Sequence, residues 1–298
     1  MFKTFISSRN LAKSKITNIF LILGLTLAAL FLSSISFAQT ELTVQSSASP
    51  FDLDIASPVY QAGSDSKSAD FQANYLPTFQ EFINANLTEK GALQDTSSLS
   101  LDPSKLFLST QSDVRAYFIG EGAGYHNTLG FNVTGSGIET GDPQLIFPDS
   151  SSRNSYYQDA DSTQGYRSSS YPLLPGDFVD LGTHEAGTQL DFFVIANGAN
   201  GGTNVFSTNE SINPDGINHV ISYAIEDSPY LLIGFEDLYG GGDRDFNDLI
   251  LVADIGESNV QNLILTSNPE PSTLLTLSLF SGFAYLKTRK RSVSTIAI

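Results

Sequence analysis

Acidic side chains crowd one glycine-rich stretch of this 298-residue sequence. Residues 236–248 hold five carboxylates, one amide and three consecutive glycines. Like charges at this density repel one another, and calcium takes about six to eight oxygen ligands from carboxylates, amides and carbonyls. The stretch therefore predicts a calcium site, with Asp237, Asp243 and Asp245 as the strongest ligands. The complete predicted ligand set is Glu236, Asp237, Asp243, Asp245, Asn247 and Asp248.

Two other interpretations of the same acids stay open. The stretch could be a charged turn that water alone solvates. An extracellular glycoside hydrolase would use two carboxylates about 5 to 10 Å apart, such as Glu236 or Asp237 with Asp245. Acids crowded into one glycine-rich turn favour a metal ion over a separated acid and base.

Other catalytic chemistries lack their residues. The chain has no cysteine, which excludes thiol nucleophiles and thiolate metal sites. His126, His184 and His219 share no metal-ligand spacing, so each is expected to be a hydrogen-bonded structural residue. No G-x-S-x-G motif and no phosphate-binding loop occurs. We therefore expect a protein that is not an enzyme and has no catalytic residues.

The elements that must position the acids are short strands. Apolar runs at Tyr230–Phe235 and Leu249–Ile255 flank the acidic turn and predict a β-hairpin. Similar runs recur between turn signals, which indicates a mainly β fold, a jelly-roll-like β-sandwich over residues 106–256. The other expected strands are Leu106–Ser109, Val114–Ile119, Leu129–Val133, Gln144–Phe147, Phe178–Leu181, Gln189–Ala196, Val205–Thr208 and His219–Ile225.

One short helix is expected before the strands, in a helical lead-in over residues 71–105. Aromatic residues recur at three- and four-residue steps in Phe71–Leu87, but Pro77 interrupts them. The helix is therefore expected to begin at Thr78, with Thr78 as N-cap and Glu81 completing a capping box. Residues 39–70 are expected to be an extended linker, residues 149–170 a surface loop, and residues 257–268 a strand or linker.

The N-terminal segment has the layout of a secretory signal peptide. Basic residues precede the apolar run Ile19–Leu32, and Ser36-Phe37-Ala38 forms a small-x-small cleavage site. Residues 1–38 are thus expected to direct export, with signal peptidase cutting after Ala38. A membrane anchor is the alternative, but the apolar run is short for a bilayer span of about twenty residues.

The C-terminal segment has the layout of a sorting tail. A rigid polar motif, Pro269, Glu270 and Pro271, precedes the apolar run Thr273–Leu286 and a basic cluster at residues 287–291. The basic cluster is expected to stay on the cytoplasmic side, which makes residues 269–291 a sorting and membrane segment and residues 292–298 a short cytoplasmic end. Residues 257–268 would link it to the β domain. A simple membrane anchor is the alternative.

The rest of the chain is strongly acidic. The formal net charge is −17, and eight of the 15 basic residues lie in the two terminal segments. The remainder therefore has seven basic residues against 31 of the 32 acidic residues, a charge of −24. This charge excludes electrostatic binding to nucleic acid and suits cation binding by an exported protein.

Two segments resemble known sequences. The tail is similar to the PEP-CTERM sorting signal of bacterial exopolysaccharide-associated proteins, which implies recognition by an exosortase-type membrane protease. The stretches Gly234–Asp237 and Gly240–Asp248, with upstream segments from Leu106 onward, resemble a family of exported bacterial domains of unknown function. That resemblance spans 106–255 and implies an exported β domain that binds calcium, with no reaction.

The expected function is that of a non-enzymatic protein of the cell surface or extracellular matrix, transiently anchored in the membrane during sorting. The alternative is a calcium-dependent carbohydrate-binding or adhesion module for an extracellular polysaccharide. In that case the ion would bridge to sugar hydroxyls near exposed tyrosines. The candidate tyrosines are Tyr156, Tyr157, Tyr166 and Tyr171.

Overall fold

The computed structural model describes residues 45–88, 91–92, 105–153 and 167–267. All of them belong to one of the two units into which the chain divides, residues 40–298. The expected signal peptide with Ala38, and the expected tail with Pro269, Glu270 and Pro271, lie outside the described residues. No helix within the described ranges has the length and apolar character needed to cross a membrane.

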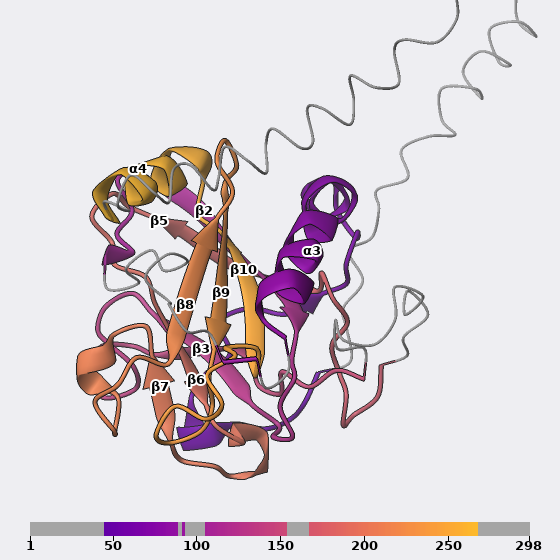
Figure 1. The fold of residues 1–298 in the computed structure, drawn as a ribbon, viewed down its shortest axis with the longest axis vertical. Coiled ribbons are helices and arrows are strands. Elements are labelled where there is room, and N and C mark those ends of the chain that lie inside the picture. The colour runs from indigo at the N-terminus through magenta and orange to yellow at the C-terminus, as the bar shows by residue number, and fades with distance from the viewer. Residues whose placement is uncertain (1–44, 89–90, 93–104, 154–166, 268–298) are drawn as a thin grey trace, which may run out of the picture. The chain divides into compact units, whose positions relative to one another are not determined.

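The described strands form two antiparallel sheets (Figure 1). The larger sheet has the order β1-β5-β2-β10-β9-β8, and the smaller has the order β4-β3-β6-β7. The strands of the larger sheet are β1 (Val59–Tyr60), β2 (Ser112–Gly120), β5 (Phe178–His184), β8 (Val220–Ala224), β9 (Tyr230–Phe235) and β10 (Leu249–Asp254). Those of the smaller sheet are β3 (Thr128–Asn132), β4 (Gln144–Phe147), β6 (Asp191–Ile195) and β7 (Val205–Ser207). The expected mainly β sandwich is thus confirmed, except that Leu106–Ser109 forms only an isolated bridge, Phe107 with Gln189.

The main core lies between the two sheets. Phe118 of β2 packs edge-on against Phe147 of β4, with 6.1 Å between the ring centroids. Successive residues of a strand point to opposite faces. Accordingly Leu251 of β10 joins the core between the sheets, whereas Ile250 and Val252 join a second apolar cluster on the outer face of the larger sheet. Because β10 is buried on both faces, its residues 249–253 form a continuous apolar run.

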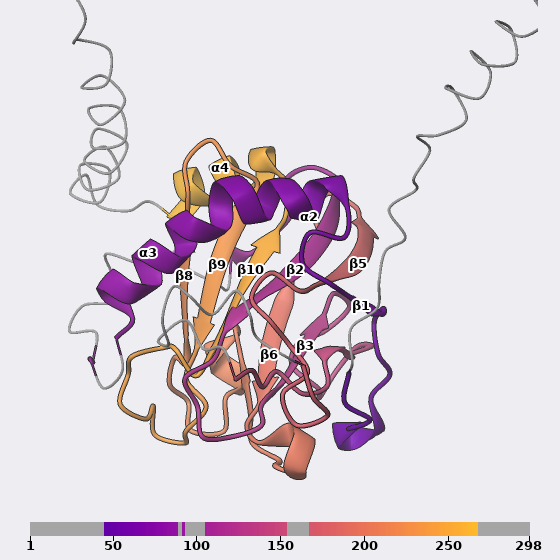
Figure 2. The same cartoon turned by 90° about the vertical axis from the view of Figure 1, so that its right-hand side faces the viewer.

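A helical segment of three consecutive parts covers that outer face (Figure 2). The parts are α2 (Ser66–Asp70), a π-helical turn η2 (Phe71–Tyr75) and α3 (Leu76–Asn86). The expected start at Thr78 was therefore wrong. The N-cap is Asp65, whose Oδ1 accepts the Ser68 N–H at 2.6 Å. The π-turn shifts the hydrogen-bond pattern just before Pro77, so this proline stands in the first turn of α3, where a missing N–H costs little.

Residues 257–267 form a helix instead of the expected strand or linker. Helix α4 (Glu257–Ser267) contributes Val260, Leu263 and Ile264 to the core between the sheets. Its apolar residues are three and four positions apart, which places them on one helical face. Asn259 fixes the helix, because its Oδ1 accepts the N–H groups of Ser109 and Thr110 at 2.7 and 2.8 Å.

Two further expectations need correction. The linker 39–70 is not wholly extended, since it contains β1, the start of the helical segment and a short 3₁₀ turn at Pro50–Asp52. The loop expected on the surface at 149–170 begins in the interior, where residues 149–152 are buried. Residues 154–166 of that loop lie outside the described ranges. Other 3₁₀ turns lie at Gly198–Asn200 and Glu210–Ile212.

Candidate metal centre

The acidic turn connects two central strands. Strands β9 and β10 pair antiparallel as expected, from Tyr230 opposite Asp254 to Phe235 opposite Leu249. β10 also pairs with β2, and β9 with β8, so neither strand of the hairpin is an edge. The turn at residues 236–248 is therefore held at the end of the most deeply buried part of the sheet.

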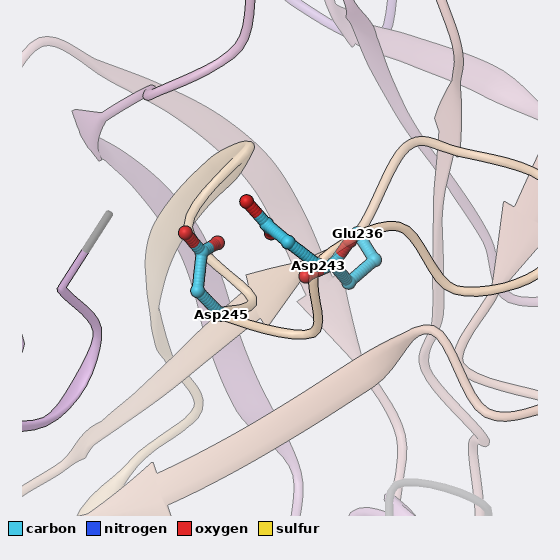
Figure 3. Close-up of side chains that lie close together, drawn as sticks. All are labelled: Glu236, Asp243 and Asp245. Atoms are coloured by element: carbon cyan, nitrogen blue, oxygen red, sulfur yellow. The ribbon is translucent and has the colours of Figure 1, made fainter. Parts of the chain in front are cut away.

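Three of the predicted ligands come together inside this turn (Figure 3). One carboxylate oxygen from each of Glu236, Asp243 and Asp245 lies within 4.8 Å of the other two. Among the described residues, no other group of three acidic or histidine side chains meets in this way. Glu236 and Asp245 are each 1% exposed, whereas Asp243 is exposed to solvent. The arrangement is a buried pair of acids with a third acid at the surface.

One oxygen of Glu236 has no donor. Oε1 accepts the N–H of Phe246 at 2.9 Å, but Oε2 is buried and has no hydrogen-bond partner among the described residues. Burial, together with the charges of Asp245 and Asp243, raises the pKa of Glu236 to about 7. A buried ionised oxygen without a partner costs several times more free energy than a paired one. A cation is the group that would satisfy it.

The glycines bring the backbone against that oxygen. Gly240, Gly241 and Gly242 have φ values of +86°, +83° and +49°, in the left-handed region that favours glycine. A Cβ placed on Gly242 would lie 2.2 Å from Glu236 Oε2, so a larger residue there would fill the space in front of this oxygen. The donor set is therefore compact, made of oxygen atoms and suited to a hard cation such as calcium.

Asp237 and Asp248 form a separate pair beside this group. The Asp237 N–H donates to Asp248 Oδ2 at 2.9 Å, and Asp237 Oδ2 accepts from Asn127 Nδ2 at 2.7 Å. Burial raises the pKa of both carboxyls, and the charge of Asp237 raises that of Asp248 further. Glu236 thus takes the place expected for Asp237, because adjacent residues at a strand end point in opposite directions.

Asn247 connects the acidic turn to neighbouring segments. Its N–H donates to Asp245 Oδ1 at 3.3 Å, and its Nδ2 donates to the carbonyl of Leu87 at the end of α3, also at 3.3 Å. Its carbonyl accepts the N–H of Gly122 at 3.0 Å. The structure therefore shows contacts of Asn247 with the helical segment and with the loop after β2.

The acidic turn is also linked to a second polar turn, residues 213–218. Asp215 Oδ2 accepts the N–H of Gly240 at 2.7 Å and lies 2.9 Å from His219 Nε2. The other histidines are hydrogen-bonded as expected, His126 to Asp149 and His184 to the carbonyl of Leu181.

Comparison with known families gives one match. Residues 185–255 match a family described as a domain of unknown function, DUF4114. The DUF4114 match holds β6 to β10 and the whole acidic turn, and it is narrower than the resemblance expected from residue 106. No curated protein and no solved structure matches the chain.

The residues that match DUF4114 do not form either sheet by themselves. β10 pairs with β2, and β6 pairs with β3, and both partners lie before residue 185. The folded unit that holds the acidic turn is therefore larger than the DUF4114 match.

Proposed function

We propose that this protein is a non-enzymatic component of the cell surface or extracellular matrix whose β-sandwich is stabilised by a calcium ion in the acidic turn. The observation that carries the proposal is the buried, unpartnered Oε2 of Glu236, close to the carboxylates of Asp243 and Asp245. Without a cation, this oxygen makes the ionised turn costly to fold. With one, the same oxygen becomes a ligand.

The ion would hold the turn of the hairpin in one conformation. Glu236 and Asp245 would bind it from inside, and Asp243 would close the site from the solvent side. Calcium fits better than zinc, because the donors are oxygens and no histidine or cysteine joins them. It also fits better than magnesium, which keeps several of its waters and demands near-octahedral geometry. In this proposal Asp237, Asn247 and Asp248 hold the wall of the site.

Export and sorting belong to the same proposal. The expected signal at residues 1–38 would take the acidic chain out of the cell after cleavage by signal peptidase at Ala38. An exosortase-type protease would then recognise Pro269, Glu270 and Pro271. Cell fractionation combined with intact-mass analysis tests both steps, because each cleavage predicts a defined mass. An exported form that keeps residues 1–38 and 269–298 would contradict the processing.

The calcium part is tested by thermal unfolding in millimolar calcium and again with excess chelator. A ligand at one hundred times its dissociation constant adds about 2.7 kcal/mol to the free energy of unfolding, so calcium should raise the melting temperature by several degrees. Asp245→Ala and the milder Asp243→Ala should both lose this rise. Magnesium at the same concentration is the matched control. A midpoint that does not move in the unsubstituted protein would refute the calcium site.

A second candidate function is calcium-dependent binding of carbohydrate. Tyr239, on the acidic turn itself, is 64% exposed, and its neighbour Leu238 is 44% exposed. An aromatic ring beside an ion would offer a stacking surface for a sugar. Of the tyrosines expected for this role, Tyr171 is half-buried under Arg153, and Tyr156, Tyr157 and Tyr166 lie outside the described residues. A polysaccharide pull-down with calcium and with chelator, repeated with Tyr239→Ala, tests this candidate.

A further inference from the structure

Two residues outside the carboxylate group connect the start of the acidic turn to the first of its glycines. His219 Nδ1 lies 3.1 Å from the carbonyl oxygen of Glu236, and the Glu236 N–H donates to the carbonyl of His219 at 2.9 Å. Through Nε2, His219 contacts Asp215 Oδ2, which accepts the N–H of Gly240. A continuous chain of hydrogen bonds thus runs from Glu236 to Gly240 without using any of the three clustered carboxylates.

We call Asp215 and His219 together the bracket, and the surrounding residues fix both of them. His219 has no exposed surface, and its ring stacks on Phe206 of β7 with 3.8 Å between centroids and an interplanar angle of 15°. The Asp215 side chain is 5% exposed. Burial acts to raise the pKa of Asp215, but the hydrogen bonds from Gly240 and His219 outweigh it and hold the pKa below its ordinary value. The smaller sheet therefore supports a fixed, charged acceptor beneath the glycine turn.

The position of the bracket bears directly on the space in front of Glu236 Oε2. That space exists because Gly242, which lies close to the oxygen, has no Cβ. Gly242 follows Gly240 by two residues. All three glycines have positive φ and would sample many conformations in an unrestrained chain. Tying the N–H of Gly240 to Asp215 restricts where Gly242 can lie relative to Glu236.

We propose that Asp215 and His219 are positioning residues of the cation site, which hold the glycine turn in its binding shape before the ion arrives. This inference rests on the proposed calcium site. A binding loop that is already ordered loses less conformational entropy when the ligand binds, so the bracket would raise affinity without touching the ion. Loss of the bracket should weaken calcium binding but leave the stoichiometry unchanged at one ion per chain.

The test is a calcium titration by calorimetry on the full exported chain, with calcium chloride as the only ligand. Asp215→Ala removes the acceptor and should weaken calcium binding about tenfold, the effect of one charge-assisted hydrogen bond. Asp215→Asn keeps an oxygen for the Gly240 N–H and should weaken binding less. Glu226→Ala is the matched control, since it removes one exposed acid at the other end of β9 and should leave the affinity unchanged.

A second measurement separates positioning from a merely structural role. If Asp215 only stabilised the fold, Asp215→Ala would lower the melting temperature equally in calcium and in chelator. Positioning predicts a smaller calcium-induced rise. His219→Gln should act in the same direction, and the double variant should lose no more than about the larger single loss, because the two residues act as one unit.

The outcomes are separable. Equal affinity of Asp215→Ala and the unsubstituted protein would overturn the bracket and leave the calcium site intact. Equal losses in Asp215→Ala and Asp215→Asn would also overturn it, because they would indicate an effect of charge and not of position. An unsubstituted protein that binds no calcium would refute the proposed function itself. Should Asp215→Ala fail to fold, Asp215→Asn and His219→Gln still decide the question.

Discussion

Two buried carboxylates in this protein differ in the partners that the chain gives them. Asp177 has no exposed surface and forms an ion pair with Arg167, at 2.5 Å from Nη2 to Oδ1. It also accepts the N–H groups of Leu174 and Ala62. Glu236 is as deeply buried, and its Oε1 accepts the N–H of Phe246, yet its Oε2 has no hydrogen-bond partner among the described residues. The chain supplies a counter-charge in the first case and none for that oxygen in the second.

Two other buried acids also have partners within the chain. Asp191 is satisfied by hydroxyl groups of Ser207 and Thr208 and by the N–H of Gly137. Asp254 forms an ion pair with Lys67 at 2.9 Å. The comparison teaches that this fold can provide partners for isolated acids through neighbouring strands and loops. Where Glu236 meets two more acids in one turn, the proposed partner is an ion from solution.

The largest expected effect comes from breaking the ion pair between Arg167 and Asp177. Arg167→Ala leaves the Asp177 carboxylate buried without its cation and should lower the free energy of unfolding by about 3–5 kcal/mol. The loss should be the same in calcium and in chelator, because Asp177 lies outside the acidic turn. Urea unfolding under both conditions measures it. Adding Asp177→Asn should recover much of the loss, and a double variant as unstable as the single one would contradict the explanation.

A more selective effect is expected at Glu236. Glu236→Gln keeps the shape but removes the charge, so it should abolish the calcium-dependent stabilisation of about 3 kcal/mol. In chelator at pH 8 the same variant should be more stable than the unsubstituted protein by on the order of 1–3 kcal/mol, since a buried unpaired charge is gone. Asp243→Asn is the control, because this acid is exposed and its loss should change the stability in chelator little. A Glu236→Gln protein that is less stable in both conditions would show that Glu236 needs no external partner.

The smallest effect per step of the experiment is a pH dependence. Glu236 has a pKa of about 7 in the folded chain and an ordinary value of 4.5, so between these pH values the folded state holds more protons. The free energy of unfolding in chelator should therefore fall as the pH rises through this window, by at most about 1.4 kcal/mol per pH unit for one group. Urea midpoints at pH 5, 6, 7 and 8 measure the slope.

Two controls sharpen the pH experiment. Burial also raises the pKa of Glu121 to about 7, so Glu236→Gln should remove only part of the slope. Calcium holds the ionised form of Glu236 and should flatten the fall, whereas acidification below pH 7 should weaken calcium binding. Identical slopes in calcium and in chelator would argue against an ion at Glu236.

Local features of the sequence sufficed for the strands and the hairpin. Tyr230–Phe235 and residues 249–253 are apolar throughout and flank a stretch of glycine and acidic residues. A hairpin signal of this kind depends only on residues close together in the sequence. The helical segment and α4 were harder to predict. Pro77 suggested a break that a π-turn avoids, and α4 has polar residues between its three buried ones.

The sequence by itself determined that acids, an amide and glycines would share one turn between two apolar strands. Only the tertiary structure decided that Glu236 joins Asp243 and Asp245 while Asp237 turns away to Asn127, since that choice depends on the directions of side chains at a strand end. Only the tertiary structure brought Asp215 and His219 beneath Gly240. Contacts of this kind join segments that the packing of the two sheets brings together. The spacing of residues along the sequence does not predict that packing.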